Sequence, residues 1–195
     1  MSTLGQRHKL TVKSSHVYSY ISVPSTGSKP TILFLHGFPC TADDWRVQIS
    51  YFSSLGYGIL APDLLGYGGT SKPISVAAYN PKSMATEVIE ILDHEKIDKV
   101  IGVGHDWASR FLSRIANYYP NRLHGIAFLS VGYAPPTQPF DLDAANTLLL
   151  KIAGYTPFGY WKFFETDAAA ALIKEHVRNI VLTYTIALNQ QLTFL

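Results

Sequence analysis

The chain has 195 residues, of which 47% are hydrophobic and 15% are charged, a composition typical of a globular protein and unlike that of a disordered one. Sixteen lysines and arginines against fourteen aspartates and glutamates leave a net charge of only +2. Because the basic residues are also scattered along the chain, we expect no nucleic-acid partner.

Cysteine and histidine usage narrows the class of protein further. The single cysteine, Cys40, excludes an internal disulfide, and the seven histidines show no metal-ligand spacing. No secretory leader is visible, and no segment reaches the ~18 consecutive apolar residues of a membrane span. We therefore expect a cytoplasmic protein without a membrane span, and we expect neither a metal nor another cofactor.

The first half of the chain alternates between strand and helix patterns. Residues 11–23 alternate apolar and polar side chains, which predicts an antiparallel hairpin, and residues 31–35 form a continuous apolar run. Thr41 and Asp44 have the spacing of a capping box and predict that a helix begins there. Residues 57–61 then predict a second buried strand.

The alternation continues to about residue 131. Asn80 and Pro81 predict the start of a helix, residues 99–103 form a β-branched strand, and the helix after it ends before Pro120. Residues 125–131 predict a further strand. Strands that alternate with helices indicate an α/β fold with a mostly parallel sheet, whose ligands bind at the carboxyl ends of the strands.

A proline-rich segment at residues 134–139 interrupts this alternation. After it, residues 148–152, 160–164 and 168–177 all have helical character, with no strand between them. We therefore expect two domains, an α/β core over residues 1–134 and a helical region over residues 135–195. The pattern of the apolar segment from residue 179 onward does not distinguish helix from strand.

Asp106 lies where the strand at 99–103 turns into a helix. Gly104 and Ala108 stand two residues before and after it, as a nucleophile elbow requires, because small residues let the backbone make the sharp turn. Two other interpretations exist. Asp106 could simply cap the helix, or the glycines could belong to a dinucleotide-binding loop, although that fingerprint needs glycine where Trp107 stands.

The tetrapeptide His36-Gly37-Phe38-Pro39 follows the strand at 31–35, at the same end of the predicted sheet as Asp106. An acyl intermediate at Asp106 would develop a negatively charged oxygen. Backbone N–H groups of Phe38 and Trp107 could form the oxyanion hole that stabilises it. An ordinary glycine–proline turn is the alternative interpretation.

Four segments carry a resemblance to a known family: HGFP at 36–39, PDLLGYGGTSKP at 62–73, GHDWAS at 104–109 and FGYWKFFE at 158–165. Together, and in this order, they resemble the α/β-hydrolase family and within it the soluble epoxide hydrolases. The resemblance implies an α/β-hydrolase fold, here incomplete, followed by the start of a helical cap.

The same resemblance assigns roles to individual residues. Asp106 is implied to be the nucleophile that forms an ester with an epoxide carbon, and Tyr160 in the cap to hydrogen-bond the epoxide oxygen. His36, Gly37, Pro39, Gly104 and His105 support the two motifs. Aspartate suits this chemistry because it is ionised at neutral pH without a base. The implied partners are a small apolar epoxide and water.

Related hydrolases provide alternatives for the reaction. Haloalkane dehalogenases usually carry Asn or Glu where this chain has Phe38, and fluoroacetate dehalogenases usually have Arg where Trp107 stands. Both differences favour the epoxide.

The histidine base and its acidic partner, which follow the nucleophile in this family, have no match here. Only His124 and His176 come after Asp106, and neither has the position of a base. We therefore expect a fragment that ends inside the cap and is inactive alone. A noncatalytic small-ligand-binding homologue is the alternative.

Overall fold

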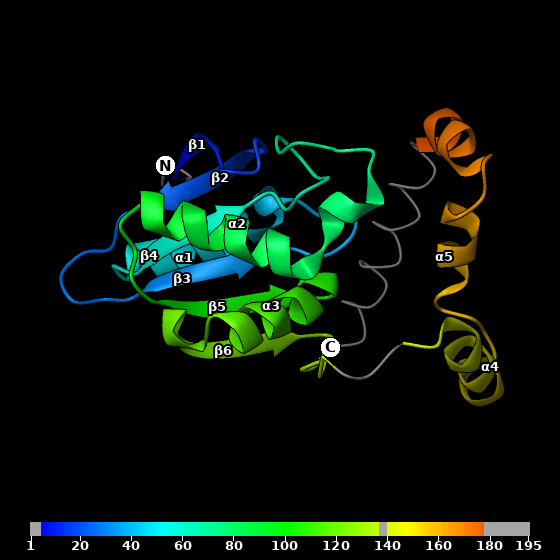
Figure 1. Ribbon diagram of the computed structural model, residues 1–195. Helices are drawn as coiled ribbons and strands as arrows, with labels where there is room; N and C mark the ends of the chain where they lie inside the picture. The colour runs from blue at the N-terminus through cyan, green and yellow to red at the C-terminus, as the bar shows by residue number, and fades with distance from the viewer. Residues whose placement is uncertain (1–4, 137–139, 178–195) are drawn as a thin grey trace. The chain divides into compact units, whose positions relative to one another are not determined.

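A computed structural model describes residues 5–136 and 140–177 (Figure 1). The chain forms two compact units, Met1–Gln138 and Pro139–Leu195. The strands of the first unit are β1 (Gln6–Thr11), β2 (Val17–Val23), β3 (Thr31–Leu35), β4 (Gly58–Pro62), β5 (Val100–His105) and β6 (Leu123–Leu129). Its α-helices are α1 (Arg46–Ser54), α2 (Pro81–His94) and α3 (Trp107–Tyr118), and its 3-10 turns are η1 (Ala42–Trp45), η2 (Val76–Tyr79) and η3 (Pro120–Arg122).

The six strands form one sheet in the order β1-β2-β4-β3-β5-β6. β1 pairs with β2, and β2 with β4, in antiparallel fashion, whereas β3, β4, β5 and β6 run parallel. The sheet is therefore mixed but mostly parallel, as the sequence predicts.

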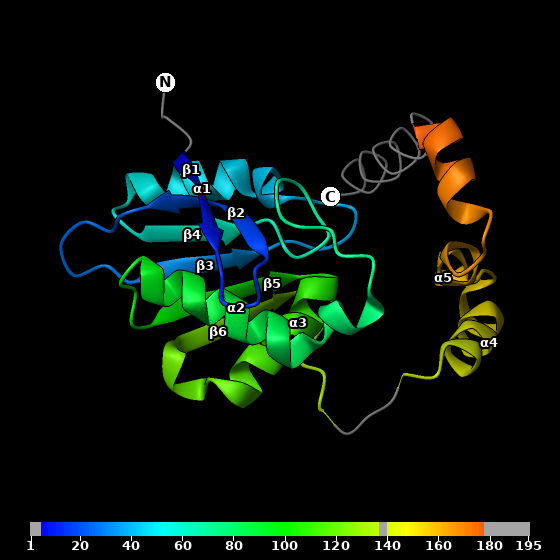
Figure 2. The same cartoon turned by 45° about the horizontal axis from the view of Figure 1, so that its top comes forward.

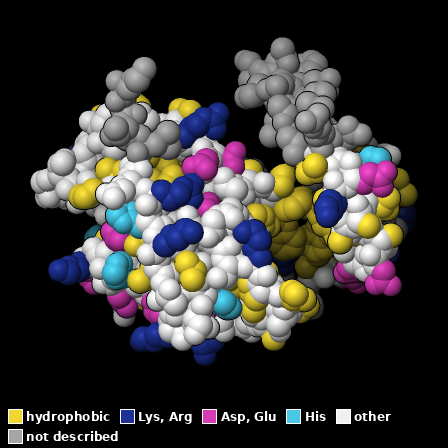
Figure 3. Space-filling model, turned by 90° about the horizontal axis from the view of Figure 1, so that it is seen from above, with side chains coloured by type: hydrophobic (Ala, Val, Ile, Leu, Met, Phe, Trp, Pro, Cys, Tyr) yellow, Lys and Arg dark blue, Asp and Glu magenta, His cyan; other side chains and the backbone are white. Residues whose placement is uncertain are grey.

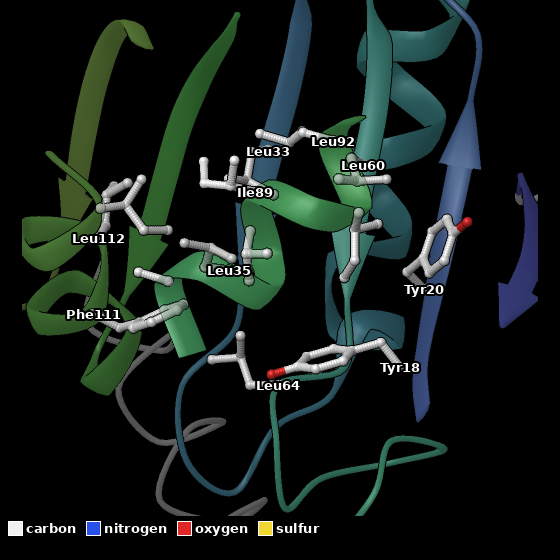
Figure 4. Close-up of a cluster of buried hydrophobic side chains, with 14 of the residues drawn as sticks. Tyr18, Tyr20, Leu33, Leu35, Leu60, Leu64, Ile89, Leu92, Phe111 and Leu112 are labelled. Atoms are coloured by element: carbon white, nitrogen blue, oxygen red, sulfur yellow. The ribbon is translucent and has the colours of Figure 1, made fainter. Parts of the chain in front are cut away.

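Helices cover both faces of the sheet (Figures 1 and 2). Along β3, Ile32 and Phe34 pack on the α1 side, and Leu33 and Leu35 pack on the side of α2 and α3. Figure 4 shows part of the buried cluster on the side of α2 and α3, in which Leu33 and Leu35 lie beneath the helices. Burial on both faces explains why residues 31–35 are apolar without alternation.

The order of the strands reverses direction at one position, between β3 and β5. From β3 the chain passes through α1 to β4 on one side, and then returns through α2 to β5 on the other side of β3. Connections therefore leave the carboxyl ends of β3 and β5 toward opposite faces of the sheet. Such a switch point is where open α/β sheets bind their ligands.

Two predicted boundaries are wrong. The hairpin begins earlier than residue 11, because its first strand is β1, which carries few apolar residues to reveal it. The last strand lies at Leu123–Leu129 rather than 125–131, because Ser130 takes a φ of +69° and ends it. The helix expected after Thr41 begins as the 3-10 turn η1 before α1.

The second unit is helical over its described residues. It contains α4 (Leu142–Ala153), α5 (Gly159–Phe164) and a helical segment at residues 169–177. Asp141 caps α4 by accepting a hydrogen bond from the backbone N–H of Ala144, and Gly154 ends it with a φ of +79°. The tail from residue 179 lies outside the described residues. None of the described helices is long and apolar enough to cross a membrane.

Candidate active site

Asp106 occupies a strained turn between β5 and α3. Its φ of +57° and ψ of −122° place it in a region that residues other than glycine rarely adopt. Such a conformation costs roughly 1–3 kcal/mol, so the surrounding structure has to enforce it. The Asp106 backbone N–H donates to the Leu129 carbonyl at 3.1 Å, and its carbonyl accepts from the Ser109 N–H at 3.0 Å.

Small residues let the chain close around this turn. A Cβ on Gly104 would lie 2.7 Å from the carbonyl oxygen of Ala108, so no larger residue fits without a shift. Ala108 itself is fully buried. The Ser109 hydroxyl donates to the Gly104 carbonyl at 2.8 Å, which ties the first turn of α3 back to β5. This contribution of Ser109 is one that the sequence analysis missed.

The loop after β3 reaches the Asp106 side chain. The backbone N–H of Phe38 donates to Oδ1 of Asp106 at 3.0 Å. A Cβ on Gly37 would lie 2.5 Å from Cβ of Asp106, so only glycine permits this approach. The next peptide bond, between Phe38 and Pro39, is cis. The two motifs that sequence alone placed at one end of the sheet are thus in direct contact.

His36 connects this loop to the segment after β4. Its side chain is buried, with Nδ1 2.9 Å from the Gly37 carbonyl and Nε2 2.9 Å from the backbone nitrogen of Leu64. A carbonyl only accepts and an amide N–H only donates, so Nδ1 carries the proton and the imidazole is neutral. Burial lowers the pKa of His36, which also favours the neutral form.

Asp63 anchors the segment after β4, and nothing in the sequence singled it out from the glycine-rich loop. Its buried carboxylate accepts from Arg7 at 2.8 Å, from the backbone N–H of Ala42 at 2.9 Å and from that of Gly69 at 2.9 Å. A buried carboxylate needs partners of this kind. The sequence signal would have been an acidic residue directly after a buried strand.

A cavity of about 270 Å³ borders the site on the α1 side, lined in part by His36, Cys40, Trp45 and His105. The ring of His105, which follows Gly104 in its motif, faces the ring of Trp45 edge-on at 6.4 Å. Burial, with the charges of Asp44 and Asp106, raises the pKa of the Cys40 thiol to about 11. Cys40 is therefore a weak nucleophile at neutral pH.

Two further predicted residues lie on helices. Trp107 is the first residue of α3, where backbone N–H groups have no acceptor within the helix and point toward the helix N-terminus. Tyr160 lies on α5 in the second unit, with its ring centroid 5.5 Å from that of Phe164. The catalytic role of Tyr160 stays a prediction.

Among the described residues, no group of three His, Cys, Asp or Glu side chains could hold a metal ion.

A strained aspartate at a strand-to-helix turn, faced by a backbone donor across the switch point, defines a hydrolase of the α/β type. The family model described as "alpha/beta hydrolase fold" matches residues 30–153. The chain belongs to this family.

Its relatives in the comparisons are epoxide hydrolases. Epoxide hydrolase 3 of Siraitia grosvenorii is 36% identical over 139 residues, which are 70% of this chain and 43% of that protein. Bifunctional epoxide hydrolase 2 of Mus musculus is 34% identical over 145 residues, which are 74% of this chain and 25% of that protein. The crystal structure of epoxide hydrolase VrEH1 from Vigna radiata matches with a TM-score of 0.76 at 26% identity, covering 93% of this chain and 57% of that one.

The chain therefore spans less than half the length of the two curated relatives and a little more than half of the solved structure. The resemblance first indicated by four short motifs is confirmed for the fold and for the epoxide hydrolase relatives.

Proposed function

We propose that this chain carries the nucleophile of an epoxide hydrolase and forms a covalent ester at Asp106. An ionised oxygen of Asp106 bonds to an epoxide carbon while the ring C–O bond breaks. The electron pair of that bond goes to the epoxide oxygen, which takes a proton from water as the ring opens. The strained three-membered ring is electrophilic enough for a carboxylate to attack it directly.

The hydrogen bond between the Phe38 N–H and Oδ1 of Asp106 carries this proposal. It distinguishes the two carboxylate oxygens. Oδ1 is held by the backbone donor, so Oδ2 is the oxygen that attacks, and Oδ1 becomes the carbonyl oxygen of the ester. When a nucleophile later adds to that ester, the negative charge develops on Oδ1, beside a donor that is already in place.

We further propose that the chain alone does not hydrolyse the ester. Hydrolysis needs a base that activates water. His124 lies at the amino end of β6, whereas Asp106 follows the carboxyl end of the neighbouring parallel strand β5, so His124 is at the wrong end of the sheet. His176 does not have the sequence position of the family's base, which follows a later strand of the core.

Intact-mass spectrometry after incubation with styrene oxide tests the proposal. We expect one adduct per chain, mapped to Asp106, and no steady production of diol. Hydroxylamine should remove the adduct, because it cleaves esters but not alkylated cysteine or histidine. Sustained diol formation would show that the chain hydrolyses its ester, and an adduct that resists hydroxylamine would contradict ester formation.

Asp106→Asn is the matched control, since it keeps the size of the side chain but removes the carboxylate. We expect no hydroxylamine-sensitive adduct in this variant. Cys40→Ala should still form the ester, because the Cys40 thiol is protonated at neutral pH. Epoxide binding that survives in Asp106→Asn, without an adduct in the wild type, would favour a noncatalytic binding protein.

A further inference from the structure

The peptide unit between Gly37 and Phe38 is held at both ends. Its carbonyl oxygen lies 2.9 Å from His36 Nδ1 and accepts from the Cys40 backbone N–H at 3.1 Å. Its N–H donates to Oδ1 of Asp106. In a planar trans peptide the C=O and N–H point in opposite directions. Whatever fixes the direction of this carbonyl therefore also fixes the direction of the Phe38 N–H.

His36 connects that carbonyl to a rigid part of the molecule. Its Nε2 accepts from the N–H of Leu64, directly after Asp63, whose buried carboxylate is itself fixed by Arg7 and two backbone donors. The ring of Tyr67 packs edge-on against the imidazole at 5.0 Å. The His36 side chain thus bridges the segment after β4 and the peptide that faces Asp106.

We propose that His36 is a positioning residue whose neutral imidazole keeps the Phe38 N–H directed at the oxygen of Asp106 that bears the charge when the ester is cleaved. This inference rests on the proposed function of Asp106 as the ester-forming nucleophile. Without the His36 bond, the peptide can rotate and turn its N–H away, because the Cys40 N–H is then the one remaining donor that the structure gives to the carbonyl.

The bridge exists only while the imidazole is neutral. Protonation would place a hydrogen on Nε2, opposite the N–H of Leu64, and would replace an attraction with a repulsion. Burial disfavours the charged form of His36, whereas the hydrogen bond to the Gly37 carbonyl and the carboxylates of Asp63 and Asp44 favour it. The net direction is a lowered pKa, so His36 is neutral at pH 7 and the bridge is intact there.

The rate at which hydroxylamine cleaves the Asp106 ester tests this role directly. Hydroxylamine adds to the ester carbonyl, negative charge develops on Oδ1, the bond to the alkyl oxygen breaks with proton transfer from hydroxylamine, and the diol leaves. This reaction needs no histidine base. Loss of a positioned oxyanion donor costs enzymes about 100- to 1,000-fold in rate, and we expect about 10- to 100-fold slower cleavage in His36→Phe, where the donor is misdirected.

His36→Asn is the rescue variant, because its amide can still donate to the Gly37 carbonyl. We expect its cleavage rate to lie within about 3-fold of the wild type, because the Phe38 N–H stays directed at Asp106. After denaturation all three esters should react at one rate. If the wild type forms no ester, the proposed function fails. If the ester forms and His36→Phe reacts as fast as the wild type, the role of His36 is refuted.

The amide NMR signal of Phe38 gives a second measurement, should His36→Phe not fold. In the wild type we expect this signal to lose its low-field position as the pH falls and His36 becomes protonated. His36→Asn should keep that position over the pH range in which the wild type loses it. An identical pH profile in both proteins would overturn the proposal, since a merely space-filling histidine would not act on this amide.

Discussion

The two outer strands of the sheet differ sharply in chemistry. β1 has the sequence QRHKLT and exposes Arg7 and Lys9, whereas β6 has the sequence LHGIAFL, contains no Asp, Glu, Lys or Arg, and leaves Ile126 and Leu129 each 42% exposed. In Figure 3, on the side where β1 lies, charged side chains of both signs are interspersed over the first unit. Charges on an outer strand discourage pairing with other chains. β1 is built as a solvent-facing edge, and β6 is not.

Carboxylates on α2 fix the β1 side of the molecule. Glu87 is buried and accepts from the hydroxyls of Tyr18 and Ser14, each at 2.6 Å, and it lies 2.8 Å from His16 Nδ1. Glu95, near the helix end, accepts from Tyr20 at 2.6 Å and from Ser22 at 2.9 Å. The antiparallel hairpin is therefore attached to the core by these polar contacts as well as by the buried side chains of β2.

Removing the buried carboxylate should break this attachment and have the largest effect. We expect Glu87→Ala to lower the free energy of unfolding by about 2–3 kcal/mol, because the hydroxyl of Tyr18 would stay buried without its acceptor. Urea denaturation measures this. Glu87→Gln keeps an acceptor and should lose less than half as much. Equal losses in the two variants would mean that charge, rather than hydrogen bonding, stabilises the hairpin.

The hydroxyl of Tyr18 should make the free energy of unfolding sensitive to alkaline pH. Burial, with the hydrogen bond to Glu87, raises the pKa of Tyr18 above its ordinary value near 10. Above pH 10 the unfolded chain loses a proton that the folded protein keeps, so the free energy of unfolding falls as the pH rises, by about 1.4 kcal/mol per pH unit for one proton.

Tyr18→Phe removes the ionisable hydroxyl, so this pH dependence of the free energy of unfolding should be absent from the variant. We expect the variant to be about 1 kcal/mol less stable than the wild type at pH 8, from the lost hydrogen bond. That deficit should disappear between pH 10 and pH 11. A constant difference across this range would show that Tyr18 ionises in the folded protein as it does in water.

Placing a charge on β6 or an apolar side chain on β1 should change the association between chains more than the free energy of unfolding. We expect Ile126→Lys to reduce aggregation and Lys9→Ile to increase it, with the free energy of unfolding changed by only about 0.5 kcal/mol in each, since both positions are at least partly exposed. Static light scattering at a series of protein concentrations measures the difference. If Lys9→Ile aggregates while Ile126→Lys behaves as the wild type, the β6 side does not drive association.

Local patterns predicted most of the first unit. The continuous apolar run of β3 and the Asn80–Pro81 start of α2 were confirmed, because strand burial and helix capping depend on neighbouring residues. β1 escaped prediction, since its charged outer side gives it too weak an apolar alternation.

By itself the sequence determined the family and the position of Asp106, the nucleophile that we propose. The elbow around Asp106 needs small residues at fixed short spacings, and such a requirement is visible in the chain. Only the tertiary structure decided which oxygen of Asp106 accepts from the Phe38 N–H. It also decided that His36 accepts from the backbone N–H of Leu64, 28 residues away. These contacts join loops that follow three different strands, and nothing local in the sequence encodes how the sheet brings those loops together.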